Sequence, residues 1–131
     1  MSHMISKVVR WLEKNSRIAW TLTVCYMVLI FLISSSPYMT QPSPLESKEA
    51  PIVEHMIEYS ILGFLLLGSL SSKKMSDKEL VILAISISIL YGISDEIHQF
   101  FVPGRYCDVI DVLANSVGSF IGVMIAKMAK G

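Results

Sequence analysis

The chain has 131 residues, of which 53% are hydrophobic, and a mean hydropathy of +0.56. This length suits one domain over residues 1–131, and the hydrophobic content exceeds that of ordinary soluble domains. The 11 basic and 11 acidic residues give a formal net charge of zero, so no excess of positive charge indicates a nucleic-acid partner.

The N-terminal segment indicates an amphipathic helix. Met1 to His3 belong to MSHM, which resembles the remainder of a cloning tag, and they are left out of the functional interpretation. In residues 7–17, KVVRWLEKNSR, basic residues are interleaved with Val8, Val9, Trp11 and Leu12. This pattern predicts an interfacial helix on the inner leaflet of a membrane.

An uncharged stretch from Ile18 to Leu45 follows. It contains IAWTLTVCYMVLIFLIS, which at ~1.5 Å per residue is long enough to cross a ~30 Å hydrocarbon layer. The stretch is too long for a signal peptide, so we expect it to remain in the mature chain. It also argues against a soluble four-helix bundle. The predicted fold is all-α, a polytopic integral membrane protein with four transmembrane helices in a bundle, at about 18–36, 52–70, 79–98 and 109–126.

The distribution of Lys and Arg predicts the orientation of these spans. Nine basic residues would lie on one side and only two, Lys48 and Arg105, on the other. Because cytoplasmic loops carry the excess of positive charge, both termini should be cytoplasmic. The loops at 37–51 and 99–108 then face outward in a multi-pass membrane protein. The nine residues are Lys7, Arg10, Lys14, Arg17, Lys73, Lys74, Lys78, Lys127 and Lys130.

Three of the four spans carry their ionisable groups at the predicted outer end. This pattern predicts a polar pocket that opens outward near the level of the lipid headgroups. The second span contributes Glu54, His55, Glu58 and Tyr59; the third contributes Asp95, Glu96, His98 and Gln99; and the fourth contributes Asp108, Asp111 and Asn115.

Helical spacing indicates that these groups can converge. Asp108, Asp111, Asn115, Gly118 and Gly122 follow one another in steps of three or four, which places them on one helix face. The Gly-x-x-x-Gly pair on this face lets a second helix approach closely in lipid. The acids and the small residues should therefore both point into the bundle.

Several of these residues have simpler interpretations. Glu54, Glu58, Glu96 and Asp108 can be hydrated residues at the membrane interface. Asp108 can also be the N-cap of the last span, and Arg105 can form a structural ion pair with Asp111 or Asp95. The remaining polar residues lie deeper and are harder to explain in this way: His55, Asp95, Gln99, Asp111 and Asn115.

The string YGISDEIHQFFVPGRYCDVIDVLANSVGSFIG resembles the core motif of the VanZ-like family of bacterial membrane proteins. The family pattern is Asp-Glu-x-x-Gln, then Pro-Gly-Arg, then Asp-x-x-x-Asn and a Gly-rich end. EHMIEYSILGFLL is similar to the family's His-x-x-x-Tyr element, although Glu54 stands where many relatives have a basic residue. The resemblance covers roughly residues 52–122. It implies a plasma-membrane protein whose namesake is associated with resistance to the lipidated glycopeptide teicoplanin.

The residues and the resemblance single out the same candidate site. The candidate metal ligands for a divalent ion are His55, Asp95, Glu96 and Asp111, although their spacing matches no metal motif. The candidate substrate-binding residues are Arg105, Asp108 and His98, with Arg105 holding a phosphate or carboxylate. The candidate catalytic residues are His55, Tyr59, Asp95, Glu96, Gln99, Asp111 and Asn115.

Three functional hypotheses remain open. The protein can be an enzyme that uses acid–base or metal-assisted chemistry on membrane lipids or lipid-linked envelope precursors at the outer leaflet. It can instead bind a lipid headgroup or the lipidated glycopeptide without chemistry. In the third hypothesis the polar residues only stabilise helix packing or a homo-oligomer.

Overall fold

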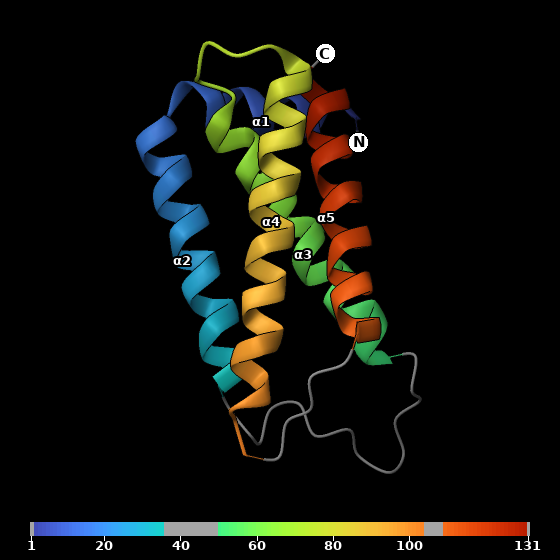
Figure 1. Cartoon of the computed structure of the whole chain (residues 1–131). Coiled ribbons are helices and arrows are strands. Elements are labelled where there is room, and N and C mark those ends of the chain that lie inside the picture. Colours follow the sequence, from blue (N-terminus) through green and yellow to red (C-terminus); the bar gives the residue numbers. More distant parts are fainter. Residues whose placement is uncertain (1, 36–49, 104–108, 131) are drawn as a thin grey trace.

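A computed structural model describes residues 2–35, 50–103 and 109–130. In these ranges the chain forms helices and no strand (Figure 1). Helices α2 to α5 are each long and apolar enough to cross a membrane. The predicted all-α fold with four spans and a preceding helix is therefore confirmed. The helices are α1 (Ser2–Lys14), α2 (Ser16–Ser35), α3 (Ala50–Leu70), α4 (Asp77–Phe100) and α5 (Val109–Lys130).

Most helix ends lie a few residues outside the predicted spans, because hydropathy marks only the apolar part of a helix. Helix α4 begins two residues early at a capping box. The Ser76 hydroxyl accepts a hydrogen bond from the Glu79 amide at 3.2 Å, and the Glu79 carboxylate accepts one from the Ser76 amide at 3.2 Å. Helix α5 continues past residue 126 through Lys127 and Lys130, whose charges suit a helix C-terminus.

Helix α1 differs from the prediction in its bounds and in its partners. It spans Ser2–Lys14 instead of residues 7–17, because the chain turns at Asn15 and starts α2 at Ser16. It crosses the end of the bundle (Figure 1) and contacts α2, α3 and α5. Val9 and Leu12 are buried, whereas Trp11 remains exposed. One side of this amphipathic helix is thus covered by the protein, and the other remains available to a membrane surface.

Helix α3 is the centre of the bundle, because it contacts each of the other four helices. Its closest neighbour is α5. A Cβ atom built on Gly118 would overlap the backbone of Met56, and one built on Gly122 would overlap the backbone of Ser60. The Ser60 hydroxyl also donates a hydrogen bond to the Gly118 carbonyl at 2.9 Å. The predicted close approach through the glycine pair is confirmed.

Buried hydroxyl pairs join neighbouring helices within the apolar part of the bundle. Thr23 of α2 and Ser69 of α3 lie 2.8 Å apart, and Ser88 of α4 and Ser119 of α5 lie 2.5 Å apart. All four side chains are buried. Hydrogen bonds of this kind help to hold helices together where apolar surroundings give no net hydrophobic drive to association.

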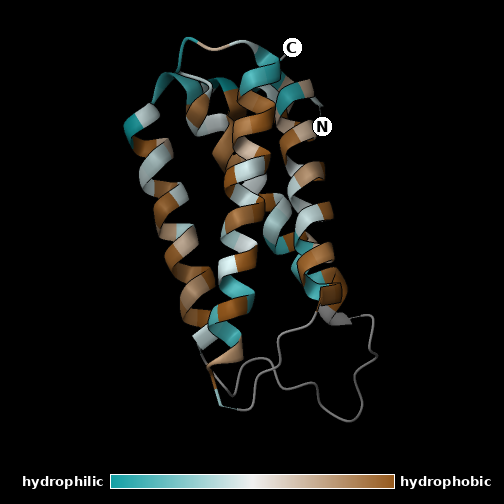
Figure 2. Ribbon diagram, in the orientation of Figure 1, coloured by the Kyte–Doolittle hydropathy of each residue, from teal (hydrophilic) through white to brown (hydrophobic). Residues whose placement is uncertain are grey.

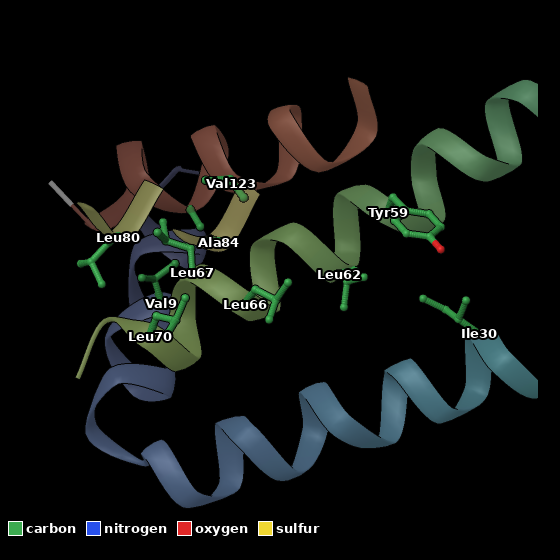
Figure 3. Packing of buried hydrophobic residues seen from close by; sticks show 11 residues of the cluster. Val9, Ile30, Tyr59, Leu62, Leu66, Leu67, Leu70, Leu80, Ala84 and Val123 are labelled. Atoms are coloured by element: carbon green, nitrogen blue, oxygen red, sulfur yellow. The ribbon is translucent and has the colours of Figure 1, made fainter. Parts of the chain in front are cut away.

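Apolar side chains form both the inside and the outside of the bundle. Buried residues run along α3 from Leu70, next to Val9 of α1, to Tyr59 (Figure 3). Large apolar residues are also exposed along the outer faces, among them Leu32 of α2, Leu90 of α4 and Phe120 of α5. Figure 2 shows the resulting hydrophobic ribbons with polar segments near their ends. This is the surface that a lipid bilayer requires.

The two ends of the bundle differ in charge. The nine Lys and Arg residues within the described ranges lie on α1, around the α3–α4 turn, at the start of α2 or in the last turn of α5, and we call this the basic end. At the opposite end α2 and α4 finish and α3 and α5 begin. This acidic end carries Glu54, Glu58, Asp95, Glu96 and Asp111, and no Lys or Arg among the described residues.

Candidate functional site

The candidate site lies at the acidic end and is divided by helix α4. Asp95 and Glu96 are consecutive, so their side chains leave the helix about 100° apart. Both are buried, with exposed fractions of 5% and 1%. Asp95 contacts residues of α2 and α3, whereas Glu96 lies with residues of α3 and α5. Two polar clusters result.

The first cluster surrounds the Asp95 carboxylate and consists of Ser34, Tyr59, Asp95 and Gln99. The carboxylate accepts hydrogen bonds from Ser34 Oγ at 2.5 Å, Tyr59 Oη at 3.2 Å and Gln99 Nε2 at 3.4 Å. Gln99 Nε2 also donates to Ser34 Oγ at 3.2 Å. All four side chains are buried. This Asp95 cluster ties α2, α3 and α4 together and fixes the orientation of the carboxylate.

The second cluster consists of His55, Glu96 and Asp111, one residue from each of α3, α4 and α5. A potential ligand atom from each residue lies within 4.8 Å of the other two. His55 Nε2 is 3.8 Å from Asp111 Oδ2, and these two side chains are 15% and 21% exposed. Asp111 lies in the first turn of α5, where the positive end of the helix dipole favours a carboxylate. This His55 cluster can exchange protons with a bound molecule or hold a cation.

Asn115 lies one turn below Asp111 on the same face of α5. Its side chain is 1% exposed. Both its amide nitrogen and its amide oxygen lack a hydrogen-bond partner among the described residues. Its Nδ2 atom is 3.5 Å from where a Cβ of Gly92 would be, and Gly92 is one turn below Glu96 on α4. The amide therefore lies beneath the His55 cluster, between α4 and α5.

The structure brings together three of the four predicted metal-ligand candidates. Asp95 is absent from the group of His55, Glu96 and Asp111, because its position on α4 directs it toward Ser34 and Tyr59. His55 and Tyr59, four residues apart on α3, also belong to different clusters, since Tyr59 bonds to Asp95. Residues that are close together on one helix can therefore belong to different clusters.

His98 lies away from the His55 cluster. Its Nε2 is 2.8 Å from Ser35 Oγ, and its ring stacks on Phe31 at a centroid distance of 4.5 Å. Both partners belong to α2. A substrate-binding role for His98 stays a prediction, as do the predictions for Arg105 and Asp108, which lie outside the described residues.

Glu54 and Glu96 were both interpreted as hydrated residues at the membrane interface, and the exposure of their side chains differs. Glu54 is exposed, as expected of a hydrated residue. Glu96 is 1% exposed, so its interpretation as a hydrated interface residue is wrong. It is buried because it lies between α3 and α5, in the middle of the acidic end.

Sequence reasoning missed Ser34, which donates a hydrogen bond to Asp95 at 2.5 Å. The first span was left out of the predicted site because it carries no ionisable residue. The only signal was the run of serines at residues 34–36, at the same end of the bundle as the acids. Serine is common within membrane helices, so this signal is weak on its own.

Together these features define a helical, multi-pass membrane protein with buried polar clusters at one end. The VanZ/LLP1 family model matches residues 19–130, nearly the whole chain. The chain therefore belongs to the VanZ/LLP1 family, which is linked to glycopeptide resistance. The match confirms the resemblance found in the motifs. Comparison with curated proteins found no match, and comparison with solved structures found none either.

Proposed function

We propose that the protein acts on a lipid or a lipid-linked envelope molecule at the outer face of the plasma membrane. The observation that carries this proposal is the convergence of His55, Glu96 and Asp111 from three helices whose outer surfaces are apolar. Burying ionisable groups at this depth costs free energy, and in membrane proteins such groups mark sites of function.

The chemistry of the proposed reaction is acid–base catalysis. His55 transfers a proton to or from the bound molecule, and Asp111 orients its ring from 3.8 Å. Asp95 is a second acid or base, held by the hydroxyl groups of Ser34 and Tyr59. Arg105 would bind a phosphate or carboxylate of the substrate through charge-assisted hydrogen bonds.

A groove between α2 and α3 supports a substrate with an acyl or prenyl chain. Its volume is about 290 Å³. Apolar residues such as Leu29, Ile33 and Ile57 line it, and Glu54 and Glu58 lie at its acidic end. A chain in this groove would leave its headgroup near the two clusters. A lipid-tailed molecule therefore suits the site better than a wholly water-soluble one.

The orientation of the protein is testable with cysteine labelling. The nine basic residues at one end favour a cytoplasmic basic end and an outward-facing acidic end. We expect a membrane-impermeant maleimide to label Cys107 in intact cells. In a Cys107→Ser background, Ser72→Cys at the basic end should label only after the membrane is permeabilised. Labelling of Ser72→Cys in intact cells would contradict the proposed orientation.

The functional proposal predicts that Asp111→Asn and His55→Gln abolish resistance to a lipidated glycopeptide while protein levels in the membrane stay normal. The minimum inhibitory concentration and the protein level are measured for each variant in cells that otherwise lack the protein. Asp77→Asn is the matched control, because Asp77 is an exposed carboxylate of α4 at the opposite, basic end of the bundle. It should keep full resistance.

The same measurement separates catalysis from binding alone. A binding pocket depends on shape, so Asp111→Asn would keep most of the resistance and Asp111→Leu would lose it. Loss in both variants at normal protein level supports catalysis. Loss of the protein itself in both variants, with Asp77→Asn unaffected, would assign the cluster to helix packing and end the functional proposal.

A further inference from the structure

We propose that His55, Glu96 and Asp111 form a binding site for a divalent transition-metal ion of the Zn²⁺ and Mn²⁺ class. One imidazole and two carboxylates form a nitrogen and oxygen ligand set that suits these ions. Three protein ligands with a remaining open position are typical of catalytic metal sites. The ion's role as a cofactor rests on the proposed function, whereas its binding rests on the geometry alone.

The distances agree with a metal-ion site before the ion binds. Ligand atoms of the three residues lie within 4.8 Å of one another. Zinc binds nitrogen and oxygen ligands at about 2.0–2.2 Å, so neighbouring ligands around one ion are roughly 3–4 Å apart. Side-chain adjustments on the order of 1 Å would therefore close the site. His55 and Asp111 lie in the first two turns of their helices, and their side chains are 15% and 21% exposed, which gives an ion an entry path.

Asn115 provides an independent indication of a ligand. Its amide is 99% buried and has no partner for its nitrogen or its oxygen among the described residues. Leaving a buried amide without hydrogen-bond partners is energetically unfavourable. Because the amide lies beneath the cluster, next to Gly92, its oxygen can bind the ion and its nitrogen can donate to a ligand carboxylate. His55 Nδ1 is likewise buried with no hydrogen-bond partner among the described residues.

Charge also favours a cation here. Two carboxylates and an imidazole lie together at this end of the bundle, and both carboxylates also make other interactions within the protein. A divalent ion would neutralise both carboxylates at once. The rival source of positive charge is Arg105, which lies outside the described residues.

The test is metal binding by the purified full-length chain in detergent micelles, without any activity assay. Zn²⁺ binding is measured by isothermal titration calorimetry, and Mn²⁺ binding by the loss of the free-ion signal in electron paramagnetic resonance. We expect one ion per chain. Asp111→Asn, Glu96→Gln and His55→Gln should each weaken binding roughly tenfold or more. Glu54→Gln, the exposed neighbour of His55, should bind like the wild type.

A variant that is expected to bind the ion more tightly separates the loss of a ligand from misfolding. Asn115→Asp keeps the size of the side chain and adds a carboxylate beneath the cluster, so it should tighten Mn²⁺ binding. Circular dichroism and gel filtration check the fold of each variant. A folded wild-type chain that binds neither ion overturns the proposal. Binding that Asp111→Asn, Glu96→Gln and His55→Gln all leave unchanged also overturns it. Metal binding without any effect of the ligand variants on resistance would uphold the site and contradict the proposed function.

Discussion

Gly122→Ala is expected to destabilise the folded protein by about 1–3 kcal/mol, the usual cost of overfilling a close-packed contact. A Cβ at this position would overlap the backbone of Ser60, which cannot move without separating α3 from α5. The measurement is unfolding of the purified protein in mixed detergent micelles, followed by circular dichroism. The fraction folded should fall at lower denaturant than in the wild type.

Gly68→Ala is the matched control for this prediction. Both substitutions replace a buried helical glycine and gain the same intrinsic helix propensity, ~1 kcal/mol. A Cβ at Gly68 would meet Leu12 Cδ1 at 2.7 Å, the end of a flexible side chain that can move aside. Its stability should change little. Equal destabilisation by the two variants would contradict the assignment of the α3–α5 backbone contact as the critical one.

Asp95→Leu should cost about 2–5 kcal/mol of stability. The Ser34 and Tyr59 hydroxyls and the Gln99 amide would lose their common acceptor, and each such bond in a membrane protein is worth about 0.6–1.7 kcal/mol. Asp95→Asn keeps an acceptor oxygen for two of these donors, and its amide can donate to Ser34 Oγ. We expect this variant to lose under about 1 kcal/mol in the same unfolding measurement.

Two further variants show whether the stability lost in Asp95→Leu comes from the contacts of the Asp95 cluster. Ser34→Ala removes only the contact of α2, so it should cost no more than about 1.7 kcal/mol. Glu54→Leu removes an exposed carboxylate from the same end of the bundle and should be close to neutral. If Asp95→Leu and Glu54→Leu had the same stability, the Asp95 cluster would not hold the helices together.

Some positions could be predicted from the sequence. For these residues, helical periodicity and the ends of the helices determine where they lie. The sequence placed His55 and Asp111 at the starts of two spans and Glu96 at the end of another, and the structure brings them together. The stripe through Gly118 and Gly122 was predicted in the same way. These features follow from spacing within one helix and from the alternation of helix direction across a membrane.

The rest depends on how each helix is rotated against its neighbours, and spacing alone does not determine this. Asp95 and Glu96 were both assigned to one predicted site, yet they belong to different clusters. His98 faces α2 because Phe31 and Ser35 are there, and neither residue signals this contact in the sequence. Ser34 was missed because a serine at a helix end has many ordinary roles.

The division of two consecutive carboxylates between two clusters has a mechanical consequence. Asp95 is bound to α2 and α3 on one side of α4, and Glu96 lies with α3 and α5 on the other. Both side chains are attached to the same turn of α4, so a rotation of this helix about its axis would move both carboxylates. A rotation that brings one of them closer to a bound molecule or ion would therefore change the position of the other within its own cluster. In this way the C-terminal turns of α4 link the two clusters mechanically.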